Sequence, residues 1–382
     1  MHCQFPLQYI QYWVKLASPG EKIPRSWAYS HCSNSAYTPA ILSSPRNEQQ
    51  GDERNLAKYI CKRLLQMIPV LLGVALIVFT LMYITPSNPA NMILGDTATP
   101  EQVAALEEEL GLNDPFLVQF GNYILGIVTR FDFGTSWFTG KPIVGELLLR
   151  FPKTALLAAL SVVLSAIIGI VCGVVAATKQ YSIFDNLATA ISLVGVSMPS
   201  FWLALMLCLL FAVKLGWLPV SGSYGWEYWV LPVVTLGTSG AANIMRMTRS
   251  SMLEVIRMDY IRTARAKGQS ERMVITRHAL KNALIPVITV IGIQFGNLLG
   301  GSVLVESVFA IPGLGKYGVD AIKQRDLPAV LGSVLFLAVT FSFVNLLTDI
   351  LYSFIDPRIQ TSLGPSRRQK RAAAGKAEEG AA

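Results

Sequence analysis

The residues best suited to chemistry in this 382-residue chain lie in the short basic segment Tyr260–Gly268. Three cations alternate there with three small residues: Arg262, Ala264, Arg265, Ala266, Lys267 and Gly268. Guanidinium and ammonium groups pair with carboxylates, and small residues between them let another surface come close. The wider segment from Arg246 to Lys281 holds nine Lys or Arg residues against three acidic residues. This pattern predicts a surface that docks into a protein groove, with a solvated amphipathic surface helix as the alternative.

Residues for catalysis or metal binding are missing from the rest of the sequence. The nearest match to a phosphate-binding loop, Gly313-Leu-Gly-Lys316, lacks the required spacing. The five cysteines show no paired metal or redox spacing, and the three histidines lie outside the long apolar stretches. Those stretches hold no charged residue of the kind that ion-coupled carriers use. We therefore expect no metal, no cofactor and no enzyme activity, and an energy source supplied by a partner.

Long uncharged stretches predict how this segment is positioned. The chain is 52% hydrophobic and 15% charged, with a mean hydropathy of +0.45. A soluble chain would carry about 25% charged residues, and a helix that spans a bilayer needs about 20 apolar residues. We expect an all-α polytopic membrane protein with six transmembrane helices, at about 64–85, 154–177, 187–213, 230–247, 283–305 and 328–352.

The distribution of Lys and Arg predicts the orientation of these spans. One side collects 20 of them, at the start of the first span, at Lys179, in the central loop and after the last span. The other side has eight. Because positive loops stay cytoplasmic, both termini are expected inside, with membrane lipid as a partner. Basic loops of this kind are ordinary in membrane proteins, so nucleic-acid binding is not expected.

The two ends differ in composition from the expected membrane domain, 56–357. Residues 1–55 are rich in Tyr, Ser, Pro and Gln and have no signal-peptide core, so we expect a disordered extension or sequence read from an upstream start. The basic, Ala- and Gly-rich tail 358–382 is expected to be disordered.

Local signals predict features inside and between the spans. In the outer loop 86–153, Thr99 and Gln102 form a capping-box pattern for a helix that Gly111 ends. Pro199 is expected to kink the third span. The spacing of Gly292, Gly296 and Gly300 puts small residues on one face of the fifth span, for close helix contact.

The central loop, 246–281, is expected to be cytoplasmic and to form a helix, a turn and a second helix. Good helix formers run from Arg246 to about Ala266, Gly268 interrupts them, and Glu271 to about Leu280 resumes the pattern. This arrangement would present the basic segment at the tip of the loop.

Two parts of this loop resemble the coupling loop of permease subunits of binding-protein-dependent ABC importers. They are Tyr260-Ile-Arg-Thr-Ala-Arg-Ala-Lys-Gly268 and His278-Ala-Leu-Lys-Asn-Ala-Leu-Ile-Pro286. Arg262 and Thr263 depart from the general Glu-Ala-Ala pattern, which marks the dipeptide, oligopeptide and nickel branch. Further similar segments cover about 57–357, including Leu110–Pro115, Pro199–Trp202 and Glu306–Gly315. The long outer loop after the first span resembles the first permease of such pairs.

The resemblance implies a type I ABC importer permease fold and a set of partners. These are a second permease, two cytoplasmic ABC ATPases and an external substrate-binding protein. It implies that the ATPases contact Arg262, Thr263, Ala264, Arg265, Ala266, Lys267, Gly268, His278, Asn282 and Pro286. Candidates for the outer gate or the binding-protein side are Glu306, Pro312, Gly313, Gly315, Arg325 and Asp326, although the Pro312-Gly313 pair also fits a simple tight turn.

The cargo implied by the resemblance is a dipeptide or oligopeptide, with nickel and glutathione as alternatives. A protein of a different class, an ion-coupled secondary carrier or a channel, would work without an ATPase. Co-purification with an ATPase separates these classes.

Overall fold

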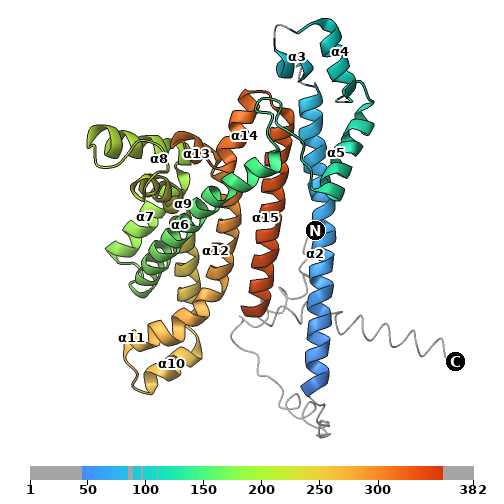
Figure 1. Cartoon of the computed structure of the whole chain (residues 1–382). Helices are drawn as coiled ribbons and strands as arrows, with labels where there is room; N and C mark the ends of the chain where they lie inside the picture. The colour runs from blue at the N-terminus through green and yellow to red at the C-terminus, as the bar shows by residue number, and fades with distance from the viewer. Residues whose placement is uncertain (1–44, 85–88, 96–97, 110, 356–382) are drawn as a thin grey trace, which may run out of the picture. The chain divides into compact units, whose positions relative to one another are not determined.

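The computed structural model describes residues 45–84, 89–95, 98–109 and 111–355. By internal contacts the chain divides into Met1–Gly51 and Asp52–Ala382, and nearly all described residues belong to the second unit. The described part is helical, as expected. Its elements are α2 (Pro45–Ile84), α3 (Pro89–Leu94), α4 (Pro100–Glu109), α5 (Phe116–Arg130), α6 (Ile143–Thr178), α7 (Ile183–Ser197), α8 (Ser200–Leu207), a π-helical segment (Cys208–Lys214), α9 (Glu227–Ile256), α10 (Asp259–Ala266), α11 (Glu271–Met273), a second π-helical segment (Val274–Ala279), α12 (Leu280–Gly301), α13 (Val303–Val308), α14 (Leu314–Lys323) and α15 (Leu327–Ile355) (Figure 1).

Four helical stretches in the described part are long and apolar enough to cross a membrane: Arg63–Leu81, Ile143–Thr178, Glu271–Gly300 and Leu327–Ile350. A fifth is obtained if α7 and the helix from Ser200 to Lys214 count as one broken span. These two pieces meet at 103° across Met198 and Pro199, a sharper change of direction than a kink. The expected stretch 230–247 is helical within α9, yet it does not reach the hydropathy of a span by composition alone.

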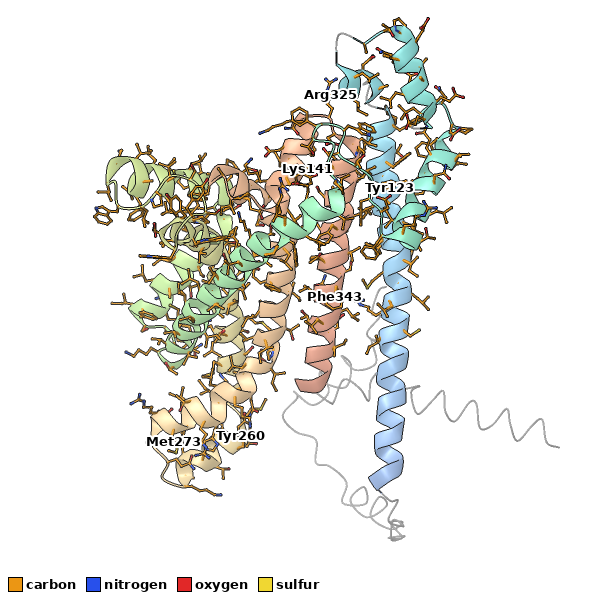
Figure 2. The ribbon with its side chains drawn as sticks, viewed as in Figure 1. Tyr123, Lys141, Tyr260, Met273, Arg325 and Phe343 are labelled. Carbon is orange, nitrogen blue, oxygen red and sulfur yellow. The ribbon has the colours of Figure 1, made fainter. Side chains whose placement is uncertain are left out.

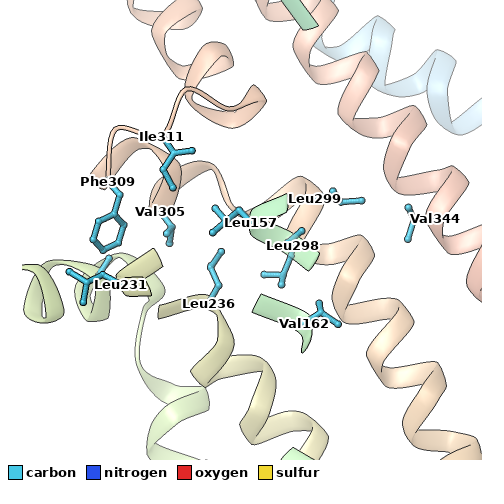
Figure 3. Close-up of a cluster of buried hydrophobic side chains, with 12 residues drawn as sticks. Leu157, Val162, Leu231, Leu236, Leu298, Leu299, Val305, Phe309, Ile311 and Val344 are labelled. Carbon is cyan, nitrogen blue, oxygen red and sulfur yellow. The ribbon is translucent and has the colours of Figure 1, made fainter. Parts of the chain in front are cut away.

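Helices α6, α9 and α12 lie side by side and enclose the main apolar core. This core includes Leu157, Leu236, Leu298, Val305 and Phe309 (Figure 3). Small residues bring α6 and α9 together, since a Cβ added at Gly169 would come within 2.8 Å of the Ala241 carbonyl oxygen. The hydroxyl of Ser165 donates to the Gly237 carbonyl oxygen at 2.8 Å, which joins the two helices by a side-chain bond.

The glycines expected to promote close packing on α12 face α15 at two of three positions. A Cβ at Gly292 would collide with the side chain of Thr348, and one at Gly296 would lie 3.3 Å from the side-chain oxygen of Asn345. Gly300 has no neighbouring atom within 4 Å of such a Cβ among the described residues.

The loop 86–153 contains the capped helix expected from the sequence. The backbone N–H of Thr99 donates to the side-chain oxygen of Gln102 at 3.0 Å, and the Gln102 N–H donates to the Thr99 hydroxyl at 3.4 Å. Helix α5 follows and packs its aromatic face on α2, where Phe79 meets Phe116 and Phe120 at ring distances of 5.4 Å. The expectations for residues 1–44 and for the tail 358–382 lie outside the described residues.

Candidate functional site

The central loop is built from two short helical pieces that follow α9. Helix α9 ends at Ile256, and α10 begins at Asp259. The expected uninterrupted helix from Arg246 to Ala266 is therefore wrong, because Met258 adopts an extended conformation with φ −70° and ψ 149° and caps a new helix. Gly268 has φ +78°, a left-handed conformation that L side chains rarely adopt, and α10 ends just before it. The turn expected at Gly268 is thus present.

A small apolar core holds these pieces against the ends of three long helices. Ile261 of α10 and Val274 are fully buried, with Met252 of α9. Ala177 at the end of α6 and Ala283 in α12 complete the same cluster. A displacement of α10 would therefore press directly on α6, α9 and α12. We call residues 257–281 the coupling segment.

Ala264 belongs to this inner core and not to the outer surface. Its side chain is 8% exposed and packs in the cluster with Ile261 and Val274. The expectation that Ala264 contributes to a contact surface is corrected, because the helix turns this residue toward α9 and α12. Ala266 and Gly268 are exposed at the end of α10.

The cations of the basic segment are all exposed, but two of them have partners within the coupling segment. Arg265 binds both carboxylate oxygens of Glu271 across the turn, at 2.6 and 3.0 Å. The hydrogen bond and charge of this carboxylate raise the pKa of Arg265 above its ordinary value. Arg262 lies 3.6 Å from the carboxylate of Asp259, one turn earlier. A partner protein would meet a tip that is basic and already ordered, with Arg265 held by Glu271.

The remaining predicted loop residues lie where α10 meets the start of α12. Tyr260 is hydrogen-bonded to the side chain of Asn282 at 2.8 Å. His278 is half-buried, and its carbonyl oxygen accepts a 3.4 Å bond from the same amide. Thr263 donates to the carbonyl oxygen of Asp259 at 3.0 Å, and Pro286 lies inside α12. Figure 2 shows Tyr260 and Met273 together at the end of the coupling segment.

The second predicted set gathers at the opposite end of α6, around the buried carboxylate of Glu306. Its oxygens accept hydrogen bonds from the Ser302 hydroxyl at 2.7 Å and from the Lys316 N–H at 3.1 Å. A Cβ at Gly313 would collide with this carboxylate, and one at Gly315 would collide with Val303 and lie 3.0 Å from the same carboxylate. Pro312 precedes them in the turn that leads into α14. Glu306 therefore orders the α13–α14 turn, and it has no free oxygen pointing outward.

Asp326 orders the segment from Ser136 to Phe138 in a similar way. Its side chain is 1% exposed and accepts bonds from the Ser136 hydroxyl and from the backbone N–H groups of Trp137 and Phe138. It also caps α15 through the Ala329 N–H at 3.3 Å. The neighbouring Arg325 is exposed, with φ +55° (Figure 2). The two predicted sets of site residues are thus separated by the length of α6 and are not brought together.

A third feature is an apolar cavity of about 260 Å³ between α6, α7 and α9, lined by residues such as Ile168, Cys172, Ala188 and Ala242. Pro199 lies outside this cavity, at the break between α7 and α8. Among the described residues no group of three or more His, Cys, Asp or Glu side chains could hold a metal ion.

The sequence did not predict an ion pair between Asp185, which is buried, and Arg249, which is partly exposed. Asp185, at the start of α7, is 1% exposed and receives two bonds from the guanidinium of Arg249, at 2.6 and 2.8 Å. The two residues are 64 positions apart, so no local pattern links them. Ser182 and Asp185 do show a helix-start pattern, which accounts for the position of Asp185 but not for its partner.

Two family matches divide the chain between them. Residues 56–158 match the N-terminal part of the membrane component of binding-protein-dependent transport systems. Residues 169–361 match the family described as the binding-protein-dependent transport system inner membrane component. The chain belongs to this family. The expected class is confirmed: the protein is a permease, a multi-pass component of the inner membrane and not an enzyme.

Two relatives of this permease align with it over almost their whole length. It is 47% identical over 330 residues to the dipeptide transport system permease protein DppB of Alkalihalophilus pseudofirmus. The alignment covers 79% of this chain and 99% of the relative. It is 42% identical over 305 residues to the glutathione transport system permease protein GsiC of Salmonella typhimurium, covering 80% and 99%. The permease therefore falls in the branch that the sequence suggested.

Proposed function

We propose that this permease and a second permease subunit form the translocation pathway of an ATP-driven importer, and that the cargo is a dipeptide or short oligopeptide. An external binding protein delivers the peptide, and two cytoplasmic ABC ATPases supply the energy. The observation that carries this proposal is the coupling segment. This segment has a small apolar core, which it shares with the ends of α6, α9 and α12, and its exposed tip is basic.

The attachment suggests how ATPase movement reaches the pathway. An ATPase that binds the exposed side of α10, near Arg262, Ala266 and Lys267, displaces the coupling segment. The inner side of this segment packs against three long helices. Because packed cores respond as rigid bodies, a displacement at the tip becomes a displacement of these helices. The coupling segment thus acts as a lever between ATP hydrolysis and the switch from inward- to outward-facing states.

The proposal includes six spans with both termini in the cytoplasm, in the manner of type I importers. The proposed domain is 56–357, and α9 supplies the fourth span. Its sides contact α6, α7, α8 and α12, and its Thr235, Gly237 and Gly240 are buried against them. A span enclosed in this way needs less apolar surface than one surrounded by lipid. Reporter fusions after Lys179, Lys214 and Lys323 test the orientation, which requires the first inside and the other two outside.

On the outer side we propose that Arg325 and the α13–α14 turn meet the binding protein or shape the outer gate. Arg325 is exposed directly beside Asp326, which fixes the adjacent loop from Ser136 to Phe138. A surface held in one conformation loses little entropy on binding, which favours a delivering protein that docks repeatedly.

Peptide cargo is supported by the relative that transports dipeptides, and glutathione is the second candidate because another relative is named for it. Neither assignment follows from the span residues, which carry no charged ligand set for either molecule.

The test uses the complete transporter, assembled with its partner permease, ATPases and binding protein in liposomes. Uptake of a labelled dipeptide that requires internal ATP supports the proposal. Uptake of glutathione or nickel ions, and no dipeptide, would replace the cargo but keep the mechanism. Transport by the permease alone, driven by an ion gradient and without ATPase, would identify a secondary carrier or channel and overturn the proposal.

A further inference from the structure

The ion pair between Asp185 and Arg249 joins two separate helices, α7 and α9, and its carboxylate is buried. Both guanidinium bonds are shorter than 3 Å, and they engage both carboxylate oxygens. The Asp185 side chain also accepts a 2.9 Å bond from the backbone N–H of Tyr181, which lies in a left-handed conformation with φ +64°. One carboxylate therefore fixes the α6–α7 turn, the start of α7 and the side of α9.

On one side of this pair, Arg249 is part of a rigid body that includes the coupling segment. It lies one turn before Met252, which is fully buried in the core of that segment. Two glycines of α6 hold this stretch of α9 at close range. A Cβ at Gly169 would lie 2.7 Å from the Cβ of Ile244, and one at Gly173 would lie 2.8 Å from the Met245 carbonyl oxygen. Helices α6 and α9 therefore cannot slide past each other without steric conflict.

On the other side, α7 packs against α9 but buries few of its own side chains. Asp185 and Ser192 are its buried residues, and the apolar cavity of about 260 Å³ separates part of it from α6 and α9. Large apolar side chains of α7, such as Ile183 and Ile191, are exposed. The end of α7 is the break at Pro199, where the chain turns by 103° into α8. The ion pair is a polar side-chain contact that joins α7 to this rigid body.

We propose that Asp185 and Arg249 are a positioning pair that makes α7, and with it the broken helix at Pro199, move together with the coupling segment during transport. The inference rests on the proposed function, because it requires an ATPase acting on that segment. A buried ion pair contributes little net stability compared with apolar side chains of similar size. Its bidentate geometry does fix direction and register, which suits a link between two elements that must turn together.

The experiment measures substrate uptake per ATP hydrolysed by the complete transporter in liposomes. Asp185→Asn keeps the size of the side chain and removes the charge. We expect normal ATPase co-purification and normal basal hydrolysis, with uptake per ATP lower by about tenfold, a typical coupling between two sites. Arg249→Gln is expected to show the same loss, and the double variant no further loss, because all three break one pair.

Two further variants separate coupling from folding. Arg249→Lys keeps a cation beside Asp185 but cannot reproduce the two-bond geometry, so a smaller loss of coupling is expected in a fully assembled complex. Asp320→Asn removes an ion pair within α14 that links no two helices, and it should leave uptake per ATP unchanged. If neither Asp185→Asn nor Arg249→Lys assembles, the pair is a folding element and the inference is wrong.

A second readout follows α7 directly, using native Cys172 of α6 and a cysteine introduced at Ala188 of α7, since both line the cavity. The other four cysteines are replaced by serine. A short bifunctional thiol reagent should cross-link the pair equally with and without ATP when Asp185 is present, and unequally in Asp185→Asn. ATP-dependent cross-linking with Asp185 present, or unchanged uptake per ATP in Asp185→Asn, overturns this inference alone. Wild-type complex that lacks ATP-dependent uptake overturns the proposed function and this inference with it.

Discussion

The side-chain amide of Asn282 donates a 2.8 Å hydrogen bond to the hydroxyl of Tyr260 and so joins α10 to the first turn of α12. Both residues belong to the segments that resemble an ATPase-coupling loop, and they are 22 positions apart. The bond lies at the surface, in contrast to the apolar core formed by Ile261 and Val274 beneath it. The coupling segment is thus fixed to α12 twice, by a buried apolar contact and by an exposed polar one.

Loss of the polar contact alone should weaken coupling without unfolding the segment. Tyr260→Phe removes the hydroxyl and keeps the ring, so we expect a cost of about 1 kcal/mol, or a factor of about five in ATPase affinity. Titration of purified ATPase onto the permease in nanodiscs measures this affinity. Asn282→Ala should give the same loss, and unequal effects of the two variants would show that the bond is not their common cause.

Loss of the apolar contact should have a larger effect that is local to the segment. Ile261 is fully buried, and its replacement by Ala is expected to cost about 2–5 kcal/mol through the cavity that it leaves. Limited proteolysis from the cytoplasmic side should then cut within residues 257–281. Met273→Ala is the matched control, because Met273 is 45% exposed on the same segment. Equal protease resistance of Ile261→Ala and wild type would contradict the role of this core.

Local signals in the sequence predicted local structure well. The Thr99 and Gln102 capping box and the turn at Gly268 both depend on residues within a few positions of each other. The break before Asp259 was not predicted, because the surrounding residues are all acceptable in a helix.

Contacts between distant residues could not be predicted in the same way. Arg249 was identified only as one of nine cations, since its partner Asp185 lies 64 positions earlier. Likewise Ala264 reads as part of a small-residue surface until α10 is folded onto α9, which places it inside. Six spans were counted from uncharged stretches. Among the described residues four helical stretches, or five with the broken pair, are long and apolar enough to cross a membrane, and α9 is not one of them.

The docking surface is tested best at Ala266 and not at Gly268. A large residue at Gly268 would strain the backbone at φ +78° as well as add bulk, at a cost of about 1–2 kcal/mol. Ala266 is exposed and helical, so Ala266→Trp adds bulk without that strain. We expect this variant to insert normally in the membrane and to lose the ATP hydrolysis that the binding protein stimulates.

Gly268→Asn is the companion variant, because Asn tolerates left-handed conformations and is small. It should retain most transport. Full transport by Ala266→Trp would show that the ATPase does not contact this end of α10.

Asp326 is expected to control the outer loop. Asp326→Ala removes the acceptor for the Ser136 hydroxyl and for three backbone N–H groups, at a cost of about 3 kcal/mol or more in a buried site. Proteolysis from the outer side should cut near Trp137 in the variant and not in wild type. Arg325→Ala is the control, since Arg325 is exposed, and it should leave the loop protected. Cleavage of both variants at the same rate would show that Asp326 does not hold the loop.

The contact between Gly313 and Glu306 makes a prediction in which two variants correct each other. Gly313→Ala adds a methyl group that meets the Glu306 carboxylate and the Thr154 hydroxyl, so we expect a loss of about 1–3 kcal/mol in thermal stability of the detergent-solubilised permease. Glu306→Ala is also destabilising, because the Lys316 N–H loses its acceptor.

In the double variant, however, the shortened side chain at 306 removes the contact with the carboxylate, and only the contact with the Thr154 hydroxyl remains. The combined loss should therefore be smaller than the sum of the two single losses, which the shift in unfolding temperature measures. Gly318→Ala is the matched control on α14, because its Cβ would lie 3.5 Å from Ser333, an ordinary contact distance. Strict additivity of Gly313→Ala and Glu306→Ala would show that the carboxylate does not require glycine at this turn.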